Sequence, residues 1–253
     1  MAETIQCRSV LLDIEGTVAP VEFVYDVMFP YIREHVAAFL SNHWAVEAVQ
    51  NAVALVGQDV GREDTKQWLS SCAAGQESRA NVDAQQKVVV DAVHQLMDKD
   101  AKVTGLKQLQ GLIWKDGFTS GQLVAELFPD VLPKLKEWQA AGLKLYIYSS
   151  GCIAAQKLFF GHTTQGDLLE MFVDHFDTTS GNKKQAASYS TIASAIGSDP
   201  ATICFISDVQ AELDAAADAG MKTVFRPTKE AAAGNDCPHP VIGSFDELGL
   251  AAA

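Results

Sequence analysis

Two carboxylates stand two residues apart, directly after a short apolar run near the start of the chain. The run Val10–Leu12 is followed by Asp13 and Glu15, and a Gly-Thr pair then turns the chain. An apolar run stopped by glycine predicts a buried strand, and open α/β sheets bind ligands beyond the carboxyl ends of their strands. At such an end Asp13 can be a nucleophile and Glu15 an acid or base. The alternative is an acid that only caps a following helix.

Three further positions present polar groups at predicted element ends. Ser149 and Ser150 follow one predicted strand, Asp208 follows another, and Lys183 precedes a predicted helix. If the strands are parallel neighbours, these groups and Asp13 converge on one edge of the sheet. The set would then be complete for phosphoryl transfer, with a nucleophile, donors for phosphate oxygens, a fixed positive charge and oxygen ligands for Mg²⁺. Taken singly, the serines and Asp208 could be helix caps and Lys183 a solvated surface residue.

The apolar pattern divides the chain into a helical stretch and a strand–helix alternation. Spacings of three and four residues predict helices over 25–40, 44–56, 64–73 and 81–99, with Pro30 kinking or splitting the first. The glycines of 109–117 are expected to bring the chain back to the core. The strands that follow are expected over 143–148, 171–176, 202–207 and 222–225, with helices over 131–141, 153–160, 188–196 and 209–219 between them, and residues 251–253 are expected to fray.

This alternation is typical of a parallel sheet built from right-handed crossovers. The predicted fold class is therefore α/β, with a parallel sheet in a core formed by residues 1–19 and 126–253. Residues 20–125 are predicted to form an all-helical subdomain inserted after the first strand.

Composition and charge limit the classes of partner. The chain has 253 residues, 48% hydrophobic and 20% charged, which predicts a packed globular protein. Its formal net charge of −13 argues against nucleic acid or an anionic membrane as the main partner. The five cysteines form no C-x-x-C pair, the first residues do not resemble a signal peptide, and no run is long enough to span a membrane. The cytoplasm is the expected compartment, with the nucleus in addition if the source is eukaryotic.

The order of the polar motifs resembles the haloacid dehalogenase (HAD) superfamily of phosphotransferases. Its first motif is normally D-x-D-G-T, and Glu15 stands where the second aspartate is usual. Five segments also look like the enolase-phosphatase E1 family of methionine salvage, and together they cover nearly the whole chain: residues 13–17, 23–31, 113–117, 147–151 and 155–162. The resemblance implies a Rossmann-like three-layer HAD core with an inserted helical cap.

The same resemblance implies a two-step reaction. A Mg²⁺-dependent enzyme would enolise 2,3-diketo-5-methylthiopentyl-1-phosphate and then remove the phosphate through an aspartyl-phosphate. The product would be the acireductone 1,2-dihydroxy-3-keto-5-methylthiopentene. One Mg²⁺ per subunit and a monomeric protein are expected.

Site roles follow from the resemblance, motif by motif. Asp13 is implied as nucleophile and metal ligand, Glu15 as a metal ligand through its carbonyl and as acid or base through its side chain, Ser149 and Ser150 as phosphate ligands, Lys183 as a stabilising and substrate-binding cation, and Asp208 as a metal ligand. Glu212, one helical turn beyond Asp208, could hold a metal-bound water or Lys183. Either Asp13 or Glu15 could be the base of the enolisation step.

Several departures and rival interpretations accompany this prediction. Cys152 and Val18 stand where hydroxyl residues are expected, which bears on substrate positioning. Phe23, Tyr25 and Phe29 could form an apolar wall for the methylthio tail or ordinary core. The rivals are a HAD phosphatase of another small phosphorylated metabolite without enolase activity, a dehalogenase, and a non-catalytic binding module.

Overall fold

The computed structural model describes residues 4–71, 78–228 and 237–253, and its contacts divide the chain into two compact units. Unit 1 comprises Met1–Val24 and Val124–Ala253, and unit 2 is the continuous segment Tyr25–Leu123. The expected insertion ran from residue 20 to residue 125. Its function as a cap remains a prediction.

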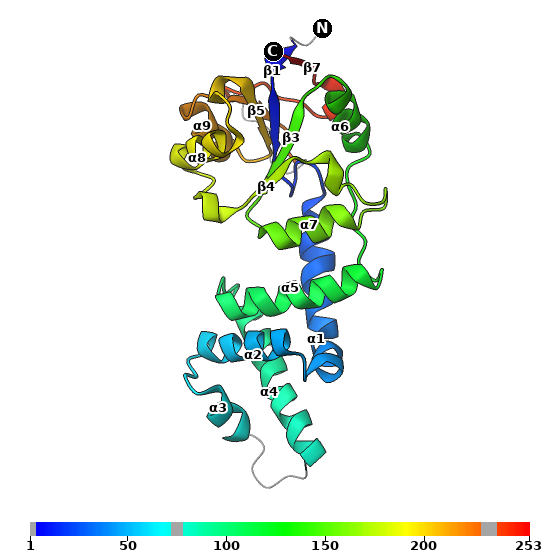
Figure 1. Ribbon diagram of the computed structural model, residues 1–253, viewed down its shortest axis with the longest axis vertical. Coiled ribbons are helices and arrows are strands. Elements are labelled where there is room, and N and C mark those ends of the chain that lie inside the picture. Colours follow the sequence, from blue (N-terminus) through cyan, green and yellow to red (C-terminus); the bar gives the residue numbers. More distant parts are fainter. Residues whose placement is uncertain (1–3, 72–77, 229–236) are drawn as a thin grey trace. The chain divides into compact units, whose positions relative to one another are not determined.

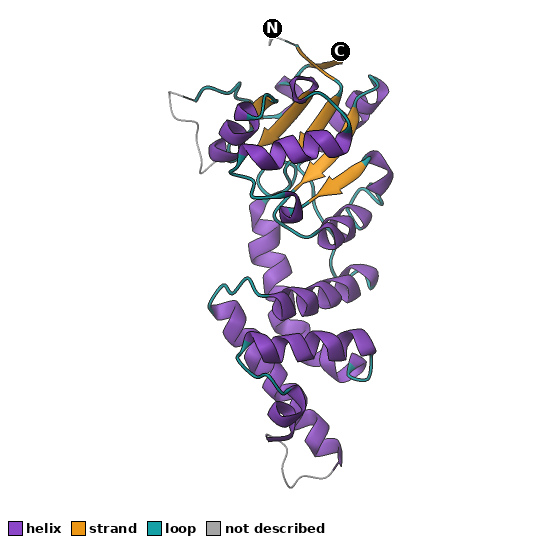
Figure 2. Cartoon of the chain, turned by 60° about the vertical axis from the view of Figure 1, so that its left-hand side comes forward, coloured by secondary structure: helices purple, strands orange, loops and turns teal. Residues whose placement is uncertain are grey.

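Unit 1 is built on a five-stranded parallel sheet with the strand order β4-β3-β2-β5-β6. The strands are β2 (Ser9–Leu12), β3 (Lys144–Tyr148), β4 (Asp174–Phe176), β5 (Ile203–Ser207) and β6 (Lys222–Phe225). The central strand β2 has Leu12 in register with Ile147 on one side and Ile206 on the other. Every residue of β2 and β5 is buried, as expected of strands covered on both faces (Figure 2).

Helices cover both faces of this sheet, which gives the predicted three-layer arrangement. They are α6 (Val131–Ala140), α7 (Ile153–Gly161), α8 (Ala186–Ile196) and α9 (Gln210–Asp218), and short 3₁₀ turns lie at Leu169–Met171, Thr178–Ser180, Pro200–Thr202 and Phe245–Glu247. Helices α8 and α9 lie on the opposite side of the sheet from α6 (Figure 1). Tyr189, Ile192 and Leu213 share one buried cluster with Leu11 and Phe205 of the sheet. The predicted α/β fold class is confirmed.

A second, two-stranded sheet joins the two ends of unit 1. It pairs β1 (Ile5–Cys7) with β7 (Leu250–Ala252) in parallel, with Cys7 opposite Ala252. The prediction that residues 251–253 fray is therefore wrong, because these residues find a backbone partner at the other end of the sequence. The strand predicted over 171–176 is also shorter than expected, because a 3₁₀ turn occupies its first residue and the strand begins at Asp174.

Unit 2 is helical in all its described regular elements. They are α1 (Phe29–His43), α2 (Glu47–Asp59), α3 (Thr65–Ser71), α4 (Ser78–Asp98) and α5 (Thr104–Thr119), and a π-helical segment, Phe23–Met28, leads into α1. Pro30 lies in the first turn of α1, directly after the π-helical segment. The expected kink or split at Pro30 stays a prediction: the chain remains helical there, and its winding changes from π-helical to α-helical at Phe29. Residues 72 and 73 of the helix predicted over 64–73 lie outside the described residues.

The expectation that glycines end the helical stretch near 109–117 is wrong. The segment lies inside α5, and two of the glycines of this helix face neighbours at close range. A Cβ on Gly105 would clash with the backbone of α2 at Leu55 and Val56, and one on Gly117 would lie 2.7 Å from the Tyr31 ring. These glycines therefore allow close helix packing and do not break the helix.

Candidate active site

Each strand of the five-stranded sheet is followed by a polar residue. Asp13 follows β2, Ser149 follows β3 and Asp208 follows β5, while Asp177 and Arg226 follow the outer strands β4 and β6. Because the strands are parallel, all five positions lie at the same edge of the sheet. Sequence reasoning expected this convergence for Asp13, Ser149 and Asp208, and the structure brings them to that edge.

Asp13 is buried and both of its carboxylate oxygens are engaged. Lys183 Nζ lies 2.5 Å from Asp13 Oδ1, and the Thr17 hydroxyl donates to Oδ2 at 3.3 Å. Asp13 and Lys183 are only 3% and 5% exposed. The Tyr189 hydroxyl, from α8, donates to the carbonyl of Lys183 at 2.7 Å. The Tyr148 ring centroid lies 5.6 Å from Lys183 Nζ. The lysine is thus fixed at its backbone and at its charged end.

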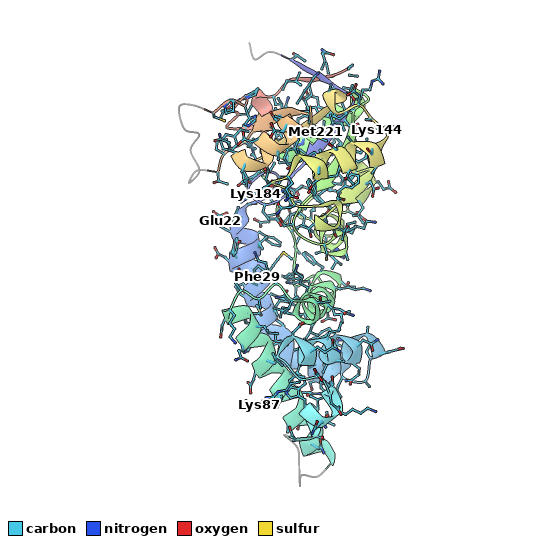
Figure 3. All side chains as sticks on the ribbon, turned by 90° about the vertical axis from the view of Figure 1, so that its left-hand side faces the viewer. Glu22, Phe29, Lys87, Lys144, Lys184 and Met221 are labelled. Atoms are coloured by element: carbon cyan, nitrogen blue, oxygen red, sulfur yellow. The ribbon has the colours of Figure 1, made fainter. Side chains whose placement is uncertain are left out.

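Glu212 supplies a second carboxylate to the same lysine. Its Oε2 lies 2.6 Å from Lys183 Nζ and accepts a hydrogen bond from the Ser207 hydroxyl at 3.0 Å. Burial by itself would lower the pKa of Lys183, but the Asp13 and Glu212 carboxylates outweigh it and hold that pKa above its usual value. Of the two roles considered for Glu212, contact with Lys183 is the one observed. The neighbouring Lys184 is exposed (Figure 3).

Glu15 faces Ser149, the residue that ends β3. The Ser149 hydroxyl is fully buried, donates to Glu15 Oε2 at 3.1 Å and accepts from the Gly151 N–H at 3.0 Å. Burial, and next the negative charge of Asp13, raise the pKa of Glu15. Ser150 is exposed at the same turn. The two serines are therefore placed differently: one holds a carboxylate and the other faces solvent.

Asp208 lies against the turn that carries Asp13 and Glu15. Gly16 has φ +78°, and a Cβ there would clash with the Asp208 carboxylate, so the turn requires glycine on both counts. Burial, followed by the charges of Asp13 and Glu212, raises the pKa of Asp208 to about 7. The carboxyl end of the sheet thus holds negative charge that one lysine does not fully compensate.

This charge balance is a test of whether a divalent cation fits the site. Burial raises the pKa of Glu212 even though Lys183 opposes it, so three of the four acids, Glu15, Asp208 and Glu212, are harder to ionise than usual. No group of three or more His, Cys, Asp or Glu side chains suited to a metal occurs among the described residues. The ligand set implied by the resemblance needs only two carboxylates, Asp13 and Asp208, and a backbone carbonyl. Hard oxygen donors in an acidic surrounding fit Mg²⁺.

Sequence reasoning missed several residues of this site. The sequence prediction includes Thr17 only as part of a turn, although a hydroxyl four residues after a strand-end aspartate is a local signal for a hydrogen bond to it. Tyr148 and Tyr189 had no such signal, because their contacts with Lys183 depend on how α8 packs. Arg226, which directly follows the strand predicted over 222–225, is also absent from the predicted site.

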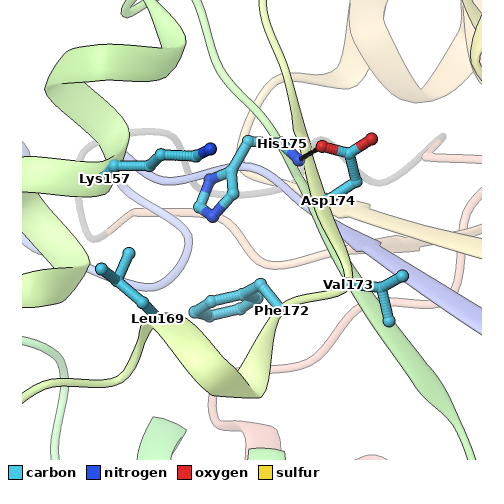
Figure 4. A pocket seen from close by; sticks show the side chains of 6 residues that line it. All are labelled: Lys157, Leu169, Phe172, Val173, Asp174 and His175. Atoms are coloured by element: carbon cyan, nitrogen blue, oxygen red, sulfur yellow. Dashed lines mark hydrogen bonds between the residues drawn. The ribbon is translucent and has the colours of Figure 1, made fainter.

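A pocket of about 210 Å³ lies apart from these residues. It is lined by Lys157 of α7, by Leu169 and Phe172, and by Val173, Asp174 and His175 (Figure 4). None of these residues belongs to the cluster around Asp13. The pocket is therefore not part of the candidate active site.

Comparisons with known proteins agree with this geometry. Residues 7–220 match the family model described as haloacid dehalogenase-like hydrolase. A protein named enolase-phosphatase E1 from Synechococcus elongatus is 43% identical over 249 residues, which cover 96% of this chain and 98% of that protein. Another of that name, from Klebsiella oxytoca, is 39% identical over 95% of this chain and 96% of its own length.

A solved structure extends the similarity. The crystal structure of unknown transcript 4 protein from Saccharomyces cerevisiae is 30% identical in sequence, with a TM-score of 0.70, and the match covers 96% of this chain and 100% of that one. Among the described residues, no helix is both long and apolar enough to cross a bilayer. About two residues in five are identical to these relatives over nearly the full length of the chain, which establishes the family. The chain belongs to the enolase-phosphatase E1 family of haloacid dehalogenase-like hydrolases.

Proposed function

We propose that this protein is an enolase-phosphatase that converts 2,3-diketo-5-methylthiopentyl-1-phosphate into the acireductone 1,2-dihydroxy-3-keto-5-methylthiopentene in methionine salvage. The observation that carries the proposal is a pair of differently placed carboxylates at one strand end. Asp13 is held by Lys183, and Glu15 is held by Ser149 with a raised pKa. Two carboxylates in unlike environments suit two unlike roles. The names of the relatives supply the substrate class.

Asp13 is the nucleophile of the phosphatase step. One of its oxygens bonds to phosphorus while the bond between phosphorus and the ester oxygen on carbon 1 breaks, and that ester oxygen takes up a proton. A water oxygen then bonds to phosphorus and the Asp13–phosphorus bond breaks, which releases inorganic phosphate. Lys183, 2.5 Å from Asp13, keeps a positive charge beside the reacting groups in both halves of the step.

Glu15 is the base of the enolisation step. It removes a proton from carbon 1, and the electron pair moves onto the neighbouring ketone, whose oxygen becomes the enol hydroxyl after protonation. A base works best when its pKa lies near the working pH, and burial raises the pKa of Glu15 toward that range. Asp13 is less suited, because Lys183 Nζ lies 2.5 Å from one of its oxygens and the Thr17 hydroxyl donates to the other.

Mg²⁺ is the proposed cofactor, held by the carboxylates of Asp13 and Asp208 and by the carbonyl of Glu15. When bound, it supplies positive charge to the phosphate oxygens. The two serines have different proposed roles. Exposed Ser150 contacts the substrate phosphate, whereas buried Ser149 orients the Glu15 side chain and the Gly151 backbone.

Unit 2 is proposed to act as the cap for the methylthio tail. Tyr25, which is 66% exposed, packs with Phe29 at a ring distance of 6.1 Å, and Phe29 packs on Trp114 at 5.9 Å. These rings offer an apolar surface. Phe23 instead packs against Phe159 in unit 1 and is buried, so it belongs to the core. We further propose a monomer that acts in the cytoplasm on a small-molecule substrate, which light scattering and cell fractionation would test.

The decisive experiment follows enol absorbance and released phosphate separately on the diketone phosphate. Wild-type protein with Mg²⁺ should form the enol-phosphate before phosphate appears, and EDTA should stop turnover. Glu15→Gln should slow enolisation by roughly 100-fold or more, while it still hydrolyses a simple phosphate ester. Asp13→Asn should abolish hydrolysis of both substrates.

The main alternative is a phosphatase of another small phosphorylated metabolite. Release of phosphate with no enol signal at any time would support it and would contradict the proposed function. Unchanged enolisation in Glu15→Gln would instead reject only the assignment of the base.

A further inference from the structure

Arg226 is a buried arginine at the end of β6 that the chemistry above does not use. It is 7% exposed, and its guanidinium carbon lies 4.4 Å from the centroid of the Phe128 ring and 4.6 Å from that of the Phe245 ring. One end of the guanidinium donates from Nη2 to both oxygens of Asp130 at 3.1 Å. The other end donates from Nη1 to the carbonyl oxygen of Thr17. The planar group is thus fixed in position and orientation.

The partner of this arginine is itself immobilised. Asp130 Oδ2 accepts hydrogen bonds from the Phe245 N–H at 2.7 Å and from the Ser244 hydroxyl at 2.9 Å. Burial by itself would raise the pKa of Asp130, but these hydrogen bonds and the charge of Arg226 hold it below its usual value. The adjoining segment is also tied to the nucleophile turn, because the Phe128 N–H donates to the carbonyl of Val18 at 3.0 Å.

Thr17 connects this arrangement to the nucleophile. Its carbonyl accepts from Arg226, and its hydroxyl donates to Asp13 Oδ2 at 3.3 Å. Lys183 holds the other oxygen, Oδ1. If the backbone of Thr17 shifts, its hydroxyl shifts with it. The orientation of the Asp13 carboxylate would then change, because that hydroxyl binds Oδ2. Arg226 does not touch Asp13, so any effect on catalysis must pass through Thr17.

A lysine could not make the same set of contacts. Arg226 Nη2 donates to both oxygens of Asp130 while Nη1 donates to the Thr17 carbonyl, and the planar group lies against two rings. An ammonium is a single compact point charge that does not span these two partners in the same way. A buried ion pair is also weak evidence for stability, because desolvation offsets most of its attraction. Arg226 Nε lacks a hydrogen-bond partner among the described residues, so the burial of this side chain is not fully compensated.

We propose that Arg226 is a positioning residue for the nucleophile: through the Thr17 carbonyl it holds the 13–17 turn so that Asp13 presents its carboxylate for attack on phosphorus. The inference rests on the proposed role of Asp13 in phosphoryl transfer. It predicts that loss of Arg226 slows formation of the aspartyl-phosphate and leaves substrate affinity nearly unchanged.

The test compares Arg226→Lys with Arg8→Lys, a conservative change at an exposed arginine of unit 1. Hydrolysis of the diketone phosphate and of a simple aryl phosphate is measured with Mg²⁺, and thermal unfolding shows whether each variant is folded. Arg226→Lys should lower kcat by roughly 10- to 100-fold, as expected for a misplaced reacting group, with KM within about twofold of wild type. Arg8→Lys should match wild type in both.

A double-mutant cycle then tests the route through Thr17. Thr17→Val removes the hydroxyl and should itself lower kcat. In the Arg226→Lys background it should lower kcat much less than in wild type, because the hydroxyl is already misplaced there. Additive effects, or a rise in KM at unchanged kcat, would overturn the inference.

A milder variant covers the case in which Arg226→Lys does not fold. Asp130→Asn keeps the shape of the side chain but weakens its contact with Arg226. This variant should lower kcat and leave KM unchanged. A kcat equal to that of wild type would overturn the inference. The two proposals fail differently. If wild type hydrolyses neither substrate, both fail; if wild type is active and folded Arg226→Lys equals it, only the role of Arg226 fails.

Discussion

At the scale of single residues, Lys183 is the group on which its buried neighbours depend most. It contacts Asp13 at 2.5 Å and Glu212 at 2.6 Å, and all three side chains are almost fully buried. A buried charge that loses its partner is far more costly than the intact pair. The stability of unit 1 and the charge of the site are therefore linked at one residue.

Lys183→Met should destabilise the protein by about 3–5 kcal/mol, because it leaves buried carboxylates without a counter-charge. Glu212→Gln in that background should recover part of this loss, because it removes one of the unpaired charges. Urea unfolding at pH 7 measures both variants. Further destabilisation by Glu212→Gln in the Lys183→Met protein would contradict the prediction.

The two neighbouring serines should respond differently to removal of their hydroxyls. Ser149→Ala takes a hydrogen bond from Glu15 and should slow enolisation by roughly 10- to 100-fold, which corresponds to the value of a hydrogen bond to a charged group. Ser150→Ala removes an exposed hydroxyl and should raise KM for phosphate esters. The rate of enolisation at saturating substrate should change little. Separate recording of enol and phosphate distinguishes them; equal effects on both steps from both variants would reject the division of roles.

His175 gives a prediction about acid stability. Gln156 Nε2 donates to the carbonyls of Gly151 at 2.7 Å and Phe176 at 2.9 Å, so its Oε1 must accept from His175 Nδ1 at 3.2 Å. Burial, and next the charge of Lys157, lower the pKa of His175, with the charge of Asp174 opposing. The pKa of histidine in the unfolded chain is about 6.5. Above that pH the His175 ring is neutral in the folded and the unfolded state, so its burial brings no penalty for losing a charge.

As the pH falls below that value, the unfolded chain takes up a proton that the folded protein resists, so the free energy of unfolding should fall. His175→Gln removes this dependence. Urea unfolding at pH 7.5 and 5.5 should show that wild type loses more stability than His175→Gln, with His94→Gln as a control at a half-buried histidine of unit 2. Equal losses in wild type and His175→Gln would show that His175 does not contribute.

At the scale of elements, the sequence predicts those helices and strands whose apolar pattern is contained within the element itself. The strands at 143–148 and 202–207 are clear because the apolar runs Leu145–Tyr148 and Ile203–Ile206 each end at a serine, and the helices of unit 1 show periodic apolar faces. Strands β1 and β7 could not be predicted, since each has three residues and a partner at the opposite end of the chain. Long-range pairing overrides local pattern there.

The candidate site divides in the same way. The strand-end positions of Asp13 and Asp208 followed from the pattern of apolar runs. Side-chain partners did not: Ser149 with Glu15 and Arg226 with Asp130 are contacts across 134 and 96 residues of sequence. Such contacts depend on the packing of whole elements, which no local signal reports.

Two glycines of helix α5, Gly105 and Gly111, have different surroundings. Gly105 meets the backbone of α2, whereas Gly111 has no atom within 4 Å of the position of an added Cβ. Gly105→Ala should therefore destabilise the protein by about 2 kcal/mol or more, because backbone cannot give way. Gly111→Ala in the same helix should stabilise it by about 0.5–1 kcal/mol through helix propensity. Thermal and urea unfolding compare the pair, and equal signs would contradict the packing explanation.

At the scale of the whole molecule, unit 1 is made of two separate stretches of chain and unit 2 of one. Strand β2, which leads to Asp13, sits at the centre of the sheet between β3 and β5. Both neighbours come later in the sequence, at Lys144–Tyr148 and Ile203–Ser207. The central strand of the fold is thus specified before either strand that flanks it.

This order has a consequence during synthesis on the ribosome. Unit 2 can complete its helix contacts as soon as residue 123 has emerged, since all of its chain is continuous. Strand β2 meanwhile remains an apolar segment with unpaired backbone until β3 and then β5 are translated. For that interval it is exposed to unwanted strand pairing. During that interval the whole of unit 2 is available to fold, whereas the strand that precedes the nucleophile lacks both of its neighbouring strands.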